Sequence, residues 1–336
     1  MASLVAVFLV VTGCGRYVDG TAVAGSRGSD PGFFFADEVP VYGQTVSNSD
    51  TIALAYLRAM RRVDVCGLVD RQALAKIGEI GSVGTLFALD ECDIDIKVPG
   101  DIDRTFVSIQ LTLARTGQPV AFRAGGLPVY ESYPGSCEYL LPVDMSGLPG
   151  AHRLRKPDQP YLRIGLIAEE NCDFAQRMVR VIAERVGPDR LPARDAVAAY
   201  PVPLAERDPC EVLSVIAGDV DHWDVSRTRP YECEFGVWRD GYPAVVSMRL
   251  SLKPQIVDNA TERRQRRDSG DAEIYLDTTF CSAVVLVGPP MQRRMVGGDF
   301  VNPGDVVIRP AVVIDSGGDN CEAVADVAAI AAKLYS

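Results

Sequence analysis

Eight of the nine cysteines fall into two sets of four, and this repeat constrains the fold more than any other feature of the chain. The first set is Cys66, Cys92, Cys137 and Cys172. The second set is Cys210, Cys233, Cys281 and Cys321. Matching members lie between 141 and 149 residues apart, which indicates two copies of one unit.

The residues around matching cysteines repeat as well. A glutamate precedes both Cys92 and Cys233, and an asparagine precedes both Cys172 and Cys321. In both copies the third cysteine opens an apolar strand and the fourth opens a helix. A chain of 336 residues also fits two domains of about 150 residues each.

The spacing of the cysteines indicates disulfides rather than a metal site. No Cys-x-x-Cys occurs, so zinc and thioredoxin-type redox chemistry are poorly supported. An even set of widely spaced cysteines in an exported protein predicts disulfide bonds. Three pairings per set are allowed by the sequence. We expect no metal and no cofactor.

The start of the chain predicts export and lipid anchoring. An apolar run at residues 4–11 leads into Val11-Thr12-Gly13-Cys14, which resembles a bacterial lipobox. We therefore expect residues 1–13 to be a signal peptide, Cys14 to carry a lipid, and residues 14–33 to form a flexible tether. The basic residues that open a signal peptide are lacking, which predicts a start codon further upstream.

Hydrophobic periodicity predicts an α+β fold with antiparallel strands in each copy. Helices are expected from Asp50 to Met60, at residues 71–80 and from Cys172 to Val186. Two-residue alternation predicts strands near residues 92–98, 107–113, 137–143 and 161–168, with one wet face. The alternation places Asp93 and Asp95 on that face. There they are solvated side chains or, as a minor alternative, calcium ligands.

The prolines after residue 187 mark a domain boundary. We predict module 1 at residues 34–187 and module 2 at residues 188–336, each an antiparallel sheet packed against helices and stapled by two disulfides. We expect separate cores and few contacts across the boundary. The two tryptophans, Trp223 and Trp238, are interpreted as core residues rather than as the lining of a pocket.

The charge of the chain limits its partners. Its net charge is −11, which argues against nucleic acid. Residues 261–272 concentrate positive charge and are predicted to form a solvated loop. The alternative is contact with anionic lipid or an acidic partner. The arginines concerned are Arg263, Arg264, Arg266 and Arg267.

Weak signals for catalysis come from one short segment. Residues 315–319 superficially resemble the nucleophile loop of trypsin-like proteases, which need a histidine and an aspartate within reach. His152 and His222, the only two histidines, lack the sequence context of that family. We interpret the segment as a glycine-rich helix entry.

With Cys14 and both cysteine sets placed, the chain resembles actinobacterial cell-envelope lipoproteins of the mycobacterial Lpp and Lpq type. Their modules open with Asp-Pro-Cys, which Asp208-Pro209-Cys210 matches and Asp64-Val65-Cys66 does not. The cysteine plan is also similar to the extracellular sensor domains of mycobacterial receptor kinases. This resemblance implies no known catalysis, and it implies pairing of the first cysteine with the second and of the third with the fourth.

Together these observations predict a non-enzymatic lipoprotein at the outer face of the cytoplasmic membrane, facing the cell wall. It would act as a binding, sensor or scaffold module for envelope proteins. Two alternatives remain: a carrier of an apolar or glycolipid ligand, and a secreted hydrolase.

Overall fold

The computed structural model describes residues 40–85, 88–99, 104–114, 117–145, 159–167, 171–187, 191–192, 203–216, 218–239, 241–254, 264–294, 305–316 and 320–336. Cys14, the tether and Arg263 lie outside these residues, as do His152 and residues 317–319. Within the described part, no helix is long and apolar enough to cross a membrane.

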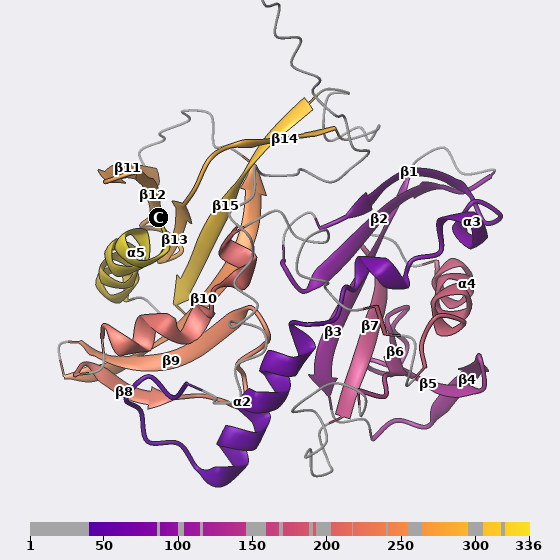
Figure 1. Ribbon diagram of the computed structural model, residues 1–336, viewed down its shortest axis with the longest axis horizontal. Helices are drawn as coiled ribbons and strands as arrows, with labels where there is room; N and C mark the ends of the chain where they lie inside the picture. The colour runs from indigo at the N-terminus through magenta and orange to yellow at the C-terminus, as the bar shows by residue number, and fades with distance from the viewer. Residues whose placement is uncertain are drawn as a thin grey trace, which may run out of the picture.

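Module 1 is an antiparallel sheet with strand order β1-β2-β3-β7-β6-β5-β4 (Figure 1). Its strands are β1 (Glu79–Gly84), β2 (Glu91–Lys97), β3 (Thr105–Ala114), β4 (Val120–Ala124), β5 (Leu127–Glu131), β6 (Tyr139–Pro142) and β7 (Gln159–Ile167). Its helices are α2 (Asn48–Met60), the 3-10 helix η1 (Cys66–Leu68), α3 (Arg71–Leu74) and α4 (Cys172–Ala183).

Module 2 repeats this plan, with strand order β8-β9-β10-β15-β13-β12-β11. Its strands are β8 (Val220–Trp223), β9 (Glu232–Arg239), β10 (Tyr242–Pro254), β11 (Arg264–Ser269), β12 (Ala272–Asp277), β13 (Ser282–Leu286), β14 (Met291–Arg294), which pairs with β15, and β15 (Asp305–Ser316). Its helices are the 3-10 helices η2 (Pro203–Glu206) and η3 (Pro209–Ser214), and α5 (Cys321–Tyr335). Except for β14, each strand of one sheet has a counterpart in the other, which confirms the tandem α+β modules.

The disulfides staple equivalent positions in both modules. Cys66 bonds Cys92 and Cys210 bonds Cys233, which ties η1 to β2 and η3 to β9. Cys137 bonds Cys172 and Cys281 bonds Cys321, which ties the start of the closing helix to the sheet. This is the pairing that the resemblance implied.

The closing helices α4 and α5 form for the same local reason. The side chains of Asn171 and Asn320 accept hydrogen bonds from the backbone N–H groups of Phe174 and Ala323 at 3.0 and 2.9 Å. Such a cap satisfies a donor that the first turn leaves open. The apolar face of each helix then packs against one face of its sheet (Figure 1).

The structure corrects two predicted elements. The helix expected at residues 71–80 ends at Leu74, and strand β1 begins at Glu79. The arginine-rich segment is not a loop in its described part, because β11 and β12 form an antiparallel hairpin at the edge of the sheet. In both cases pairing with a neighbouring strand decided the conformation.

The wet face predicted for β2 is wrong. Asp93 and Asp95 are 1% and 3% exposed. Arg104 donates from Nε to Asp95 Oδ1 at 2.6 Å, and a Cβ at Gly81 would lie within 2.3 Å of the carboxylate. The missing side chain at Gly81 therefore lets a buried ion pair pack against β1.

Each module has its own core cluster, and the described elements that contact one another extensively belong to the same module. The two cores nevertheless exchange single residues where the modules meet. Leu89 of module 1 is fully buried in the core cluster of module 2, and Val225 of module 2 packs into that of module 1. Ala88 forms a β-bridge with Ser251 of β10. Helix α2 lies between the two sheets (Figure 1).

Candidate functional site

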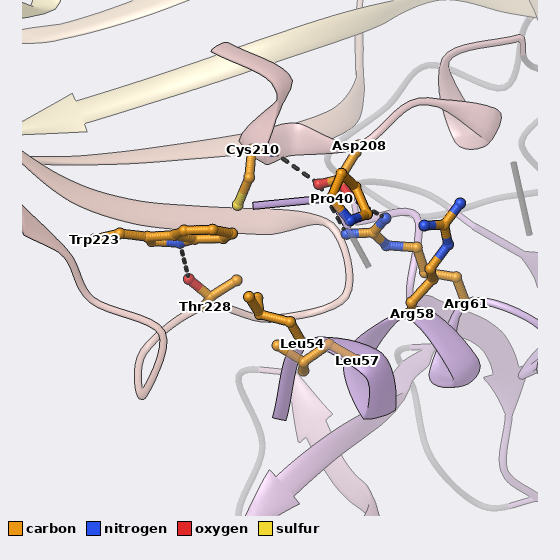
Figure 2. A pocket seen from close by; sticks show the side chains of 9 residues that line it. All are labelled: Pro40, Leu54, Leu57, Arg58, Arg61, Asp208, Cys210, Trp223 and Thr228. Carbon is orange, nitrogen blue, oxygen red and sulfur yellow. Dashed lines mark hydrogen bonds and ion pairs between the residues drawn. The ribbon is translucent and has the colours of Figure 1, made fainter. Parts of the chain in front are cut away.

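The most elaborate polar arrangement lies at the junction of the modules, around a small pocket beside α2 (Figure 2). Helix α2, whose capping box is closed by Ser47 and Asp50, ends at Met60 and delivers Arg61 to module 2. Nine residues line the pocket: Pro40, Leu54, Leu57, Arg58, Arg61, Asp208, Cys210, Trp223 and Thr228.

A buried ion pair forms one wall of this pocket. Arg61 donates from Nη1 and Nη2 to the two carboxylate oxygens of Asp208 at 2.9 and 3.1 Å. Its Nε donates to the carbonyl of Pro230, and its guanidinium lies 5.7 Å from the centre of the Tyr231 ring. Arg61 is only 3% exposed, so all of its polar groups need partners in the protein.

Asp208 connects this ion pair to the rest of module 2. Its Oδ1 accepts from the backbone N–H of Cys210 at 2.9 Å, which caps η3 next to the disulfide. The hydroxyl of Tyr335, at the end of α5, donates to the carbonyl of Asp208 at 2.8 Å. Burial acts to raise the pKa of Asp208, but the Arg61 guanidinium and the hydrogen bond from the Cys210 N–H outweigh burial and hold the pKa below its usual value.

The opposite wall of the pocket is aromatic. Trp223 donates from Nε1 to the hydroxyl of Thr228 at 3.2 Å, and Tyr42 lies 6.2 Å from it between ring centres. Burial, reinforced by the negative charge of Asp208, raises the pKa of the Tyr42 hydroxyl. Arg58 adds a second guanidinium, whose pKa is lowered by burial and by the neighbouring Arg61.

The pocket is too small for a lipid. Its volume is about 10 Å³, which is room for a single water molecule. The arrangement therefore fixes the orientation of the two modules and does not enclose an acyl chain.

Several predicted site residues stand apart from this junction. Arg266 and Arg267 lie on edge strand β11, and Arg266 pairs with Glu273 at 3.4 Å and with Asp268 at 3.2 Å. Arg264 begins the same strand. The described residues contain no group of three side chains placed to hold a metal ion.

The interpretation of the tryptophans as core residues is wrong for Trp238. Trp223 lines the pocket and contacts both core clusters, whereas Trp238 is 48% exposed. Sequence reasoning missed Arg61 as a site residue, because an arginine at a helix end usually faces solvent. Asp208 was noted only as part of the Asp-Pro-Cys motif. Its ion-pair partner Arg61 is 147 residues distant in the chain, so no local pattern connects the two.

The fold and the junction together define a tandem repeat of two disulfide-stapled α+β modules. Comparison of the chain with protein-family models, with curated proteins and with solved structures found no match.

Proposed function

We propose that this chain is a lipid-anchored protein of the bacterial cell envelope that acts by binding, as a sensor or scaffold, and not by catalysis. One observation carries the proposal: two copies of the same disulfide-stapled module are held together by a buried ion pair. Disulfides of this kind persist in oxidising compartments outside the cytoplasm. A fixed pair of modules offers a preorganised surface, which lowers the entropic cost of binding.

Lipid anchoring is tested by detergent partition. The chain is expressed in an actinobacterial host behind a complete signal peptide, with Cys14→Ala as the matched variant. The parent is expected in the detergent phase and the variant in the aqueous phase, because two or more acyl chains give stable attachment and their loss removes it. Equal partition of both proteins would contradict the anchor.

Binding is tested by chemical cross-linking in intact cells, followed by mass spectrometry of what remains attached after purification. A reproducible protein or cell-wall component attached to the chain supports a scaffold or sensor. Extraction of a stoichiometric lipid would favour the carrier interpretation instead, and turnover of a hydrolase substrate panel would overturn the non-catalytic assignment.

A further inference from the structure

A second polar and aromatic arrangement lies on the face of the module 2 sheet that is opposite α5. The register between β8 and β9 shifts between Val220 and His222. A bulge of this kind redirects side chains, and here Asp221 and His222 both turn to the open face. The imidazole Nδ1 lies 2.8 Å from Asp221 Oδ2.

Gly236 of β9 makes room for this pair. It lies between Phe235 and Val237, which point into the core, so a side chain at 236 would point to the open face. A Cβ there would meet Nδ1 and Cε1 of His222 at 2.5 Å. The imidazole therefore occupies space that only a glycine leaves open.

Next to the Asp221 and His222 pair, exposed apolar side chains of β9 and β10 lie on the same face of the sheet. Val245 pairs with Gly236, and Pro243 pairs with Trp238. Trp238 and Val245 are 48% and 40% exposed, and Pro243 is exposed as well. We call this surface the open-face strip: Asp221, His222, Trp238, Pro243 and Val245.

Charged groups border the strip. Glu234 lies two residues before Gly236 on the same face and pairs with Arg227 at 3.1 Å. The hydroxyl of Ser247, which is opposite Glu234 in the register, donates to Glu232 at 2.7 Å. Along this face of β8, β9 and β10, the exposed aromatic side chain of Trp238 is therefore followed by hydrogen-bonding groups of both kinds.

We propose that the open-face strip binds a neutral oligosaccharide. This proposal rests on the proposed binding function and specifies the class of ligand. A sugar ring has an apolar C–H face that stacks on an aromatic ring, and its hydroxyls donate and accept hydrogen bonds at the edge. Asp221, His222 and Glu234 supply such partners. The negative charge of the chain disfavours a polyanion.

The test titrates the full exported chain with three tetrasaccharides, one of neutral hexoses, one of N-acetylglucosamine and one of uronic acids. Binding is followed by calorimetry and by tryptophan fluorescence. We expect one of the two uncharged sugars to bind with a Kd on the order of 1 mM or tighter. The uronic acid should bind more weakly, because Asp221 in the strip and Glu234 beside it are negatively charged.

Three variants locate the site. Trp238→Ala removes the stacking surface, and Gly236→Ala displaces the imidazole of His222 without deleting any side chain of the strip. Each is expected to weaken binding by about tenfold or more. Phe280→Ala is the matched control, because Phe280 is an exposed aromatic residue of module 2 in a turn outside the strip (73% exposed), and it should bind as the parent does.

Absence of binding to all three sugars overturns the proposal, as does binding that Trp238→Ala leaves unchanged. Neither outcome bears on the lipid anchor or on cross-linked protein partners, so failure of the sugar site is distinguishable from failure of the proposed function. Circular dichroism confirms that the variants are folded.

Discussion

At the scale of single residues, the pair formed by Arg61 and Asp208 is the contact on which the junction depends most. Removing one partner leaves the other charged and buried. Arg61→Ala is therefore expected to lower the free energy of unfolding by about 3–5 kcal/mol, measured by urea denaturation. Arg227→Ala is the control, since it breaks an ion pair of a 69% exposed side chain and should cost about 1 kcal/mol or less. Equal losses in the two variants would contradict the importance of the junction.

The ionisation of Asp90 makes the stability of the fold depend on pH. Burial raises its pKa to about 6, and Glu91 adds to the rise while Arg229 of module 2 opposes it. Between pH of about 4 and 6 the folded state holds a proton that the unfolded state has released, so stability falls as pH rises through this window. The free energy of unfolding falls by about 3 kcal/mol over this window.

Asp90→Asn cannot ionise and should not show this loss. We expect it to match the parent at about pH 4 and to exceed the parent's free energy of unfolding by about 3 kcal/mol above pH 7. Urea denaturation at both pH values measures the difference. A difference that is the same at both pH values would show that Asp90 is not the titrating group.

At the scale of elements, β11 shows how an arginine run works as an edge strand. Its outer edge leaves backbone groups open to another chain, and charged side chains discourage such pairing. The double variant Arg266→Val/Arg267→Val is expected to self-associate as its concentration rises, measured by size-exclusion chromatography with light scattering. Arg266→Gln/Arg267→Gln keeps the edge polar and should behave as the parent does. Self-association of both variants alike would mean that apolar character is not the cause.

At the scale of the whole molecule, the junction predicts that the two modules unfold together, because the buried pair of Arg61 and Asp208 joins them. Closing a loop of about 27 residues stabilises a protein by roughly 3–4 kcal/mol, so Cys66→Ser/Cys92→Ser should weaken module 1 severely. Leu89 and Val225 each belong to the core of the other module. We therefore expect one thermal transition that shifts as a unit by calorimetry. A second transition that stays at the parental temperature would show that the modules are independent.

The sequence by itself determined the duplication, the α+β class and the elements whose signal is local. The helical periodicity of α4 and the alternation along β3 each depend on residues within one short segment of the chain. Periodicity therefore predicted them without knowledge of the fold. The disulfide pairing came from the resemblance, because the sequence alone allowed three pairings in each module.

Only the tertiary structure decided the junction, the burial of Asp93 and Asp95, and the open-face strip. Arg61 finds its carboxylate 147 residues away, and His222 fits only because Gly236 of the neighbouring strand has no side chain. A sequence pattern reports which residues share a face, but whether that face meets water is set by what packs on it. That packing brings together segments far apart in the chain, and no local pattern encodes it.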